Sequence, residues 1–355
     1  MKIAQIAPLY EAVPPLLYGG TERIVAHLSD ALVELGHEVT LFASAESRTR
    51  ARLAPARDQA LRMDSTPLKS DVAAHLSMLH EVRRRSDEFD LLHFHVDLLQ
   101  FAIFADMAGK TLTTLHGRLD LKDLAQAYRS WPQFPLVSIS HHQRKPLRFS
   151  NWAETVHHGI PETQYPFSPR PRGGGYLAFL GRISPEKRPD RAIAIAKAAG
   201  MPLRIAAKVD VADAAYFREE IEPLLNDDSI EFLGEIGDSD KPRFLGDATA
   251  LLFPIDWPEP FGLVMIEAMA CGTPVIAWNC GSVPEIIDDG VTGRVVDTFE
   301  EAVDAVAQVA TFDRARIRQT FERRFTARTM ATRYVGLYER LLQTGQDLSS
   351  MRVGT

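Results

Sequence analysis

Strand and helix patterns alternate along nearly the whole of this 355-residue chain. Short apolar runs at residues 3–7, 38–43 and 250–253 are typical of buried strands, and segments with helical periodicity follow most of the apolar runs. Parallel strands need a long crossover, usually a helix, whereas antiparallel strands can be joined by tight turns. The alternation therefore predicts an α/β protein built on parallel sheets.

A segment rich in proline and glycine, PETQYPFSPRPRGGG at residues 161–175, interrupts this alternation. The pattern restarts after it, so the segment is the expected linker between two doubly wound, Rossmann-like domains at residues 1–165 and 166–334. In the first domain we also expect strands at residues 90–95, 111–115, 136–140 and 155–158, and helices at 21–35 and 71–88. After the linker we also expect strands at 176–180, 203–207, 230–233, 273–277 and 292–295, and helices at 187–199, 213–225 and 299–310. Residues from about 312 to 345 are expected to be mostly helical, with a break near Phe325-Thr326.

Charge and composition argue against several classes of protein. The net charge of −7 disfavours general binding of nucleic acid, which requires a basic surface. The chain has no apolar run of about 18 residues that could cross a membrane, and its N-terminus enters a strand pattern without the apolar segment of a signal peptide. The two cysteines, Cys271 and Cys280, have no metal-ligand spacing. We expect a cytoplasmic protein.

The segment FPIDWPEPFGLVMIEAMACGTP, residues 253–274, contains two carboxylates that flank a helix start. Glu259 lies in a proline-rich loop after the strand at 250–253, and Glu267 lies inside the helix that begins near Gly262. Ligands of open α/β sheets bind beyond the carboxyl ends of strands, and the free N–H groups of a helix start suit phosphate. Carboxylates accept hydrogen bonds from hydroxyl groups, so this layout fits the ribose, diphosphate and sugar of a nucleotide sugar.

Two cations and a glycine pair follow the first strands of the two domains. Arg182 and Lys187 follow the strand at 176–180, and the turn at Pro185 predicts that both face one crevice, where they suit phosphate oxygens. Gly19 and Gly20 follow the strand at 3–7 and allow close approach of the backbone to a ligand, with Thr21 as the expected helix cap.

The run EPFGLVMIE, from Glu259 to Glu267, resembles the signature of the family 4 retaining glycosyltransferases, which have the GT-B fold. The resemblance extends over nearly the whole chain and implies two Rossmann-like domains that face each other across a cleft. It also implies that the segment at 335–355 crosses back to the first domain. The implied reaction is transfer of a hexose, expected to be glucose, from a UDP-sugar to an unidentified hydroxyl acceptor, which is a small metabolite, a glycan or a lipid. No metal and no cofactor is implied.

The resemblance also assigns roles to individual residues. The implied catalytic residues are His116, which ends the strand at 111–115, together with Arg182, Lys187 and Glu259. The implied donor-binding residues are Gly19, Gly20, Arg182, Lys187, Glu259, Phe261, Gly262, Leu263 and Glu267.

Two other functions remain open at this point. Glu259 and Glu267 could be the acid/base pair of a glycoside hydrolase, although Arg182 and Lys187 would then have no role. The chain could also be a non-catalytic protein that binds a nucleotide sugar. Turnover of a nucleotide sugar would separate both alternatives from a transferase. The sequence leaves the acceptor and the oligomeric state open.

Three further patterns have a simpler explanation than the function they suggest. The sequence Asp238-Ser239-Asp240 matches a metal-binding motif but precedes a helix start, so Ser239 or Asp240 is the expected N-cap. All eleven histidines lie at or before His158, without the spacing of a helical zinc site, and are expected to line a cleft. The basic residues of 141–149 could make weak contact with anionic lipid at a membrane surface, but a solvated face is favoured.

Overall fold

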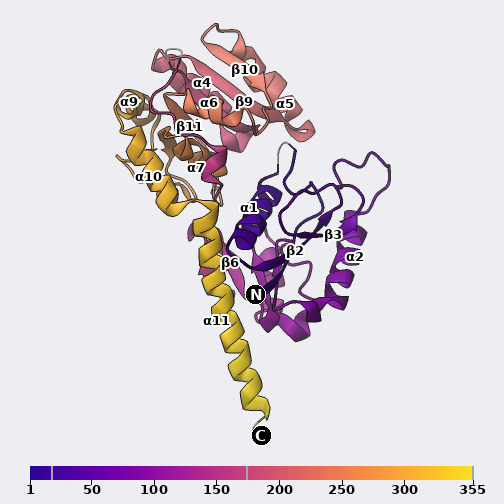
Figure 1. Cartoon of the computed structure of the whole chain (residues 1–355). Helices are drawn as coiled ribbons and strands as arrows, with labels where there is room; N and C mark the ends of the chain where they lie inside the picture. Colours follow the sequence, from indigo (N-terminus) through magenta and orange to yellow (C-terminus); the bar gives the residue numbers. More distant parts are fainter. Residues whose placement is uncertain (17–18, 173–174, 354–355) are drawn as a thin grey trace. The chain divides into compact units, whose positions relative to one another are not determined.

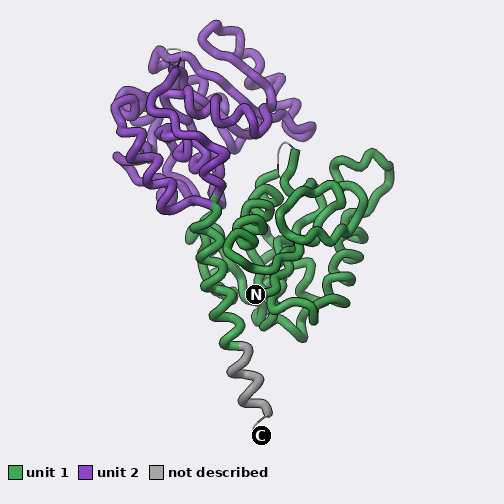
Figure 2. Tube along the Cα trace, in the orientation of Figure 1, with its two compact units in different colours: residues 1–159, 327–355 green, residues 160–326 purple. Residues whose placement is uncertain are grey.

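The computed structural model describes residues 1–16, 19–172 and 175–353, with the backbone alone for 345–353. The chain forms two compact units (Figure 2). Unit 1 comprises Met1–Gly159 and Ala327–Thr355, and unit 2 comprises Ile160–Thr326. The sequence placed the corresponding boundaries after residues 165 and 334. Within the described residues, no helix is both long enough and apolar enough to span a bilayer.

Unit 1 is built on a parallel sheet of seven strands in the order β3-β2-β1-β4-β5-β6-β7. Their bounds are β1 (Lys2–Ile6), β2 (Glu38–Ser44), β3 (Arg52–Arg57), β4 (Leu91–Phe94), β5 (Thr111–Thr114), β6 (Leu136–Ser138) and β7 (Trp152–Thr155). The direction of winding reverses between β1 and β4, which makes a topological switch point there. Strand β3 was not expected, because its sequence RLAPAR contains a proline, which sheets tolerate at an edge.

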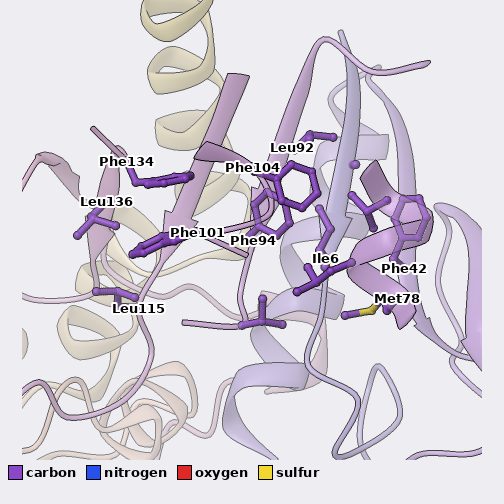
Figure 3. Close-up of a cluster of buried hydrophobic side chains, with 14 of the residues drawn as sticks. Ile6, Phe42, Met78, Leu92, Phe94, Phe101, Phe104, Leu115, Phe134 and Leu136 are labelled. Carbon is purple, nitrogen blue, oxygen red and sulfur yellow. The ribbon is translucent and has the colours of Figure 1, made fainter. Parts of the chain in front are cut away.

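Helices cover this sheet, and its main hydrophobic core lies between the sheet and these helices. The helical segments are α1 (Gly20–Glu34), α2 (Asp71–Arg84), η1 (Ser86–Glu88), η2 (Ala105–Lys110), α3 (Leu124–Ser130), η3 (His142–Leu147) and α11 (Ala327–Val353). Helix α11 packs against α1 (Figure 1). In the core the rings of Phe101 and Phe134 stack with centroids 4.3 Å apart (Figure 3). The expected capping of α1 by Thr21 is wrong, because Gly19 occupies the N-cap, and among the described residues no side chain caps the helix.

Unit 2 contains a parallel sheet of six strands in the order β10-β9-β8-β11-β12-β13. Their bounds are β8 (Leu177–Ile183), β9 (Leu203–Val209), β10 (Ile230–Gly234), β11 (Ala250–Phe253), β12 (Val275–Trp278) and β13 (Gly293–Val296). The winding reverses between β8 and β11, which pair in register with Leu177 opposite Ala250. The predicted α/β class with doubly wound parallel sheets is confirmed in both units.

In unit 2 the helices expected at residues 187–199 and 299–310 are present, the one expected at 213–225 is replaced, and a short helix at Val283–Ile286 was not expected. The helical segments are η4 (Glu162–Gln164), η5 (Pro185–Lys187), α4 (Pro189–Ala198), η6 (Val211–Asp213), α6 (Lys241–Gly246), α7 (Leu263–Ala270), α8 (Val283–Ile286), α9 (Phe299–Val309) and α10 (Arg314–Arg324). In place of one helix at 213–225 the chain forms α5 (Ala214–Tyr216), the π-helical η7 (Phe217–Ile221) and η8 (Glu222–Leu225). Pro223 lies at the junction and lacks the N–H that a regular α-helix needs.

Candidate functional site

The candidate donor-binding residues of unit 2 lie at its topological switch point. Arg182 is at the carboxyl end of β8 and Lys187 ends the following η5 turn. Glu259, Phe261, Gly262 and Leu263 follow β11, the strand that pairs with β8. Because the two strands are neighbours and parallel, the loops that follow them leave the sheet at the same edge. The fold therefore brings two segments together that are about seventy positions apart, as the Lys187–Glu259 contact shows.

Lys187 and Glu259 form an ion pair across this switch point. The pair is largely shielded from water, since the Lys187 side chain is 18% exposed and that of Glu259 is 12% exposed. The ammonium group also lies 5.1 Å from the ring centroid of Trp257 and 5.6 Å from that of Phe253. A cation near aromatic faces gains electrostatic attraction, which helps to hold Lys187 in place.

Arg182 points toward β9 rather than toward β11. Its Nη2 donates a hydrogen bond to Glu186 Oε1 at 2.6 Å, and its Nη1 lies 3.5 Å from Asp210 Oδ2. Its Nε lies 3.7 Å from Asp213 Oδ2. Burial alone would raise the pKa of the Asp210 carboxyl, but Lys208 and Arg182 together hold that pKa below its usual value. Arg182 and Lys187 thus engage different carboxylates on the two sides of β8.

The N-terminus of α7 is shaped by Gly262. This residue has a left-handed backbone, φ +81° and ψ +71°, that favours glycine. A Cβ atom there would also lie 2.8 Å from Met265 Cε and 3.1 Å from a ring carbon of Phe253. The first N–H groups of the helix, at Leu263 and Val264, have no acceptor within the helix and carry partial positive charge. This end of α7 can therefore bind an anion.

The loop that follows β12 supports the Glu259 loop. Ser282 N–H donates to Glu259 O at 3.0 Å, and Ser282 Oγ donates to Phe261 O at 2.8 Å. At Gly281 a Cβ atom would lie 2.4 Å from Glu259 N, so only glycine fits against this backbone. The sequence analysis missed Gly281 and Ser282. The glycine-serine pair after the strand was the available signal, but nothing local linked it to Glu259.

Glu267 lies inside α7 and is buried, with 2% of its surface exposed. Its Oε1 accepts a hydrogen bond from Tyr165 OH at 2.8 Å and lies 3.4 Å from Lys241 Nζ. Its Oε2 has no hydrogen-bond partner among the described residues. An unpaired buried polar atom is costly, so Oε2 is well suited to accept a hydrogen bond from a ligand hydroxyl. Tyr165 and Lys241 were not identified from the sequence.

The motif at residues 238–240 lies directly before α6. Asp238 Oδ1 lies 3.1 Å from Lys241 Nζ, which ties the motif to the cation beside Glu267. Asp240 occupies the N-cap position of α6, as predicted, although its side chain makes no capping hydrogen bond. Within the described residues, no three or more His, Cys, Asp or Glu side chains are placed to hold a metal ion.

The remaining candidate residues belong to unit 1. Gly19 and Gly20 lie at the start of α1, and a Cβ atom at Gly19 would lie 2.8 Å from Pro15 Cβ. His116 follows β5, and its Nε2 lies 2.8 Å from Nδ1 of His95, which follows β4. The ring of His158 stacks on that of His116 with centroids 5.2 Å apart. Burial lowers the pKa of His116 to about 3, so its imidazole is neutral.

Two family models together match most of the chain. The model described as Glycosyltransferase Family 4 matches residues 18–204, and the model described as Glycosyl transferases group 1 matches residues 162–321. Among curated proteins, glycogen synthase of Mycobacterium tuberculosis is 28% identical over 385 residues, which cover 92% of each chain. The phosphatidyl-myo-inositol mannosyltransferase of Mycolicibacterium smegmatis is 24% identical and covers 92% of this chain and 89% of its own.

Solved structures show the same fold. A glycosyltransferase involved in avilamycin A biosynthesis superposes with a TM-score of 0.71 at 24% identity, covering 97% of this chain and 98% of its own. Anabaena HepE in complex with UDP and glucose superposes with a TM-score of 0.72 at 19% identity, covering 99% of this chain and 100% of its own. The predicted family and GT-B architecture are thereby confirmed. The chain belongs to the family 4 glycosyltransferases.

Proposed function

We propose that this protein is a retaining transferase that moves a hexose, glucose, from its UDP-sugar to the hydroxyl group of an acceptor. The observation that carries the proposal is the Lys187–Glu259 pair beside the N-terminus of α7. A cation and the free N–H groups of a helix start suit a diphosphate, and a nearby carboxylate suits sugar hydroxyls, which supports the proposal. The presence of UDP and glucose in the HepE structure supports this choice of donor.

In this proposal the residues of unit 2 act mainly through charge. Lys187, Arg182 and the free N–H groups at Leu263 and Val264, directly after Gly262, stabilise the negative charge that develops on the departing diphosphate. Arg182 must then exchange at least part of its contact with Glu186 for phosphate oxygens. Glu259 binds hydroxyl groups of the sugar, and the free Oε2 of Glu267 binds a ribose hydroxyl. The carbonyl of Phe261 accepts a hydrogen bond from Ser282 Oγ and so stabilises the conformation of the loop.

Unit 1 supplies the acceptor side in this proposal. His116 contacts the donor sugar beside the acceptor, and the Gly19-Gly20 backbone allows close approach of the donor phosphates. The leaving phosphate removes the proton of the attacking hydroxyl on the same face of the sugar, so the anomeric configuration is retained. No carboxylate nucleophile is needed on the opposite face, which distinguishes this reaction from that of a retaining glycoside hydrolase.

The test is a turnover assay with UDP-glucose and other UDP-, GDP- and ADP-hexoses against a panel of hydroxyl acceptors. We expect release of UDP together with a new glycoside, identified by mass, with the anomeric configuration of the donor by NMR. Excess EDTA should leave the initial rate nearly unchanged. Hydrolysis of glycosides without any use of nucleotide sugars would favour the hydrolase. Tight binding of UDP without turnover on any acceptor would favour a binding protein.

A further inference from the structure

A line of buried polar side chains crosses unit 1 from α11 to His116. Gln5 on β1 lies opposite His93 on β4, and both are completely buried. The neighbouring residues Ile6 and Phe94 point to the other face of the sheet and belong to the hydrophobic core (Figure 3). Side chains alternate between the two faces of a sheet, so the polar line occupies the face opposite to that core.

Contacts along this line are short and continuous. Tyr338 OH on α11 lies 2.7 Å from His93 Nδ1 and 3.3 Å from Gln5 Nε2. Gln5 Oε1 lies 2.8 Å from His95 Nε2, and His95 Nδ1 lies 2.8 Å from His116 Nε2. Four elements, namely α11, β1 and the ends of β4 and β5, contribute to one hydrogen-bonded chain that ends at His116.

The direction of these hydrogen bonds follows from what each atom can do. Gln5 Oε1 is an amide oxygen and can only accept, so His95 Nε2 carries the proton and donates. Burial holds the pKa of His95 well below its usual value, so its ring is neutral and its Nδ1 has a lone pair. Nδ1 of His95 therefore accepts from the Nε2–H of His116.

Only one ring nitrogen of His116, Nδ1, remains available to a ligand. Its ring is neutral, since burial lowers the pKa of His116 to about 3, and Nε2 holds the only proton. Its Nδ1 has no hydrogen-bond partner among the described residues. A lone pair without a partner in a shielded place is costly to maintain unless a ligand uses it.

We propose that Gln5 and His95 are positioning residues that hold His116 in its Nε2–H form, so that His116 Nδ1 accepts a hydrogen bond from a substrate hydroxyl. The role toward substrate rests on the proposed function above, whereas the form of the His116 ring does not. The arrangement excludes His116 as a donor to a negatively charged phosphate. It favours a sugar or acceptor hydroxyl, which can donate.

The ring form is tested directly by NMR on the full chain labelled with ¹⁵N-histidine, without ligand. The His116 signals are assigned by their loss in His116→Gln. We expect a protonated Nε2 and an unprotonated Nδ1 throughout neutral pH. In Gln5→Met the acceptor for His95 is lost, and the His116 signals should shift toward a mixture of the two ring forms. A wild-type His116 that carries its proton on Nδ1 would overturn the proposal.

Kinetics supply the second test, with Gln100→Met as the matched control. Gln100 is also a completely buried glutamine of unit 1, but it donates its hydrogen bonds to Asp97 O and Thr113 Oγ1, which are not members of the line. Gln5→Met should lower kcat about tenfold and leave UDP affinity unchanged, because a misplaced catalytic group reduces the rate rather than donor binding. Gln100→Met should alter stability to a similar degree and kcat far less.

Conservative replacement separates positioning from folding. In His95→Asn the amide oxygen can replace Nδ1 as the acceptor for His116, whereas His95→Leu removes that acceptor. We expect His95→Asn to retain several times more activity and the native His116 spectrum. Equal kcat values in Gln5→Met and Gln100→Met would overturn the positioning role. A wild-type protein without any transferase activity would refute the proposed function instead, while the NMR result still decides the ring form.

Discussion

Lys187 and Glu259 form an ion pair that joins the loop after β8 to the loop after β11. The two residues come from neighbouring parallel strands on either side of the switch point of unit 2. Trp257 and Phe253 flank the ammonium group. The pair therefore fixes a cation close to the start of α7, where the diphosphate of the donor is proposed to bind.

Removal of the Lys187 ammonium should weaken UDP binding. We expect Lys187→Ala to raise the Kd for UDP by the loss of a charge-assisted hydrogen bond, about 1.5–3 kcal/mol. Lys197→Ala is the matched control, because Lys197 on α4 pairs with Asp227 in an exposed position of the same unit. Isothermal titration calorimetry of both variants checks this. Equal Kd values in Lys187→Ala and Lys197→Ala would remove Lys187 from the donor site.

The two carboxylates of the signature should respond differently to neutralisation. Glu267→Gln should weaken UDP binding. The change alters the proposed contact with the ribose, and it also alters the contacts of this side chain with Tyr165 and Lys241. Glu259→Gln should leave UDP affinity nearly intact and reduce kcat, because its proposed partner is the sugar. Calorimetry with UDP and initial rates with UDP-glucose measure the two effects. The reverse pattern would show that the roles have been exchanged.

A side chain at Gly262 should destabilise unit 2 by two separate effects. Alanine in a left-handed conformation costs about 1–2 kcal/mol. Crowding against Met265 and Phe253 should add about 1–3 kcal/mol. Gly290→Ala is the control, since Gly290 has φ +75° and no heavy atom of the described residues lies within 4 Å of a Cβ atom there. Urea unfolding should show a larger loss in Gly262→Ala, and equal losses would mean that the loop relaxes around the methyl group.

Glu22 should make the stability depend on pH. It is 5% exposed in the first turn of α1, and burial raises the pKa of its carboxyl from 4.5 to about 7. The folded state then holds the proton more tightly than the unfolded state does. Its contribution is complete below pH 4.5 and is lost as the pH rises through about 7, a change of about 3 kcal/mol.

Glu22→Gln should remove this pH dependence. Urea unfolding at about pH 5 and about pH 8 should show a smaller difference in Glu22→Gln than in the wild type. Glu300→Gln serves as the control, because Glu300 is an exposed residue in the first turn of α9. A wild-type difference that persists unchanged in Glu22→Gln would place the titrating group elsewhere.

Local sequence patterns were sufficient to predict the class of fold and the loop and helix start that carry Glu259 and Glu267. The alternation of strands and helices predicted the parallel sheets, because the spacing of apolar residues and the residues that form turns can both be recognised within short stretches of sequence. The spacing from Glu259 to Glu267 around Gly262 predicted the loop and helix start, because glycine there is required by the backbone itself. The capping prediction at Thr21 was wrong, and Asp240 occupies its predicted N-cap position without a side-chain hydrogen bond, since several local arrangements satisfy a helix start equally well.

Tertiary structure alone decided which side chains meet. Strand order placed β8 beside β11, so Lys187 pairs with Glu259, while Glu186, its neighbour in sequence, pairs with Arg182. Packing of α11 against the rest of unit 1 brought Tyr338 to His93, a contact between residues 245 positions apart. Such contacts depend on how the sheet is ordered and covered, and no pattern within a short stretch of sequence encodes that order.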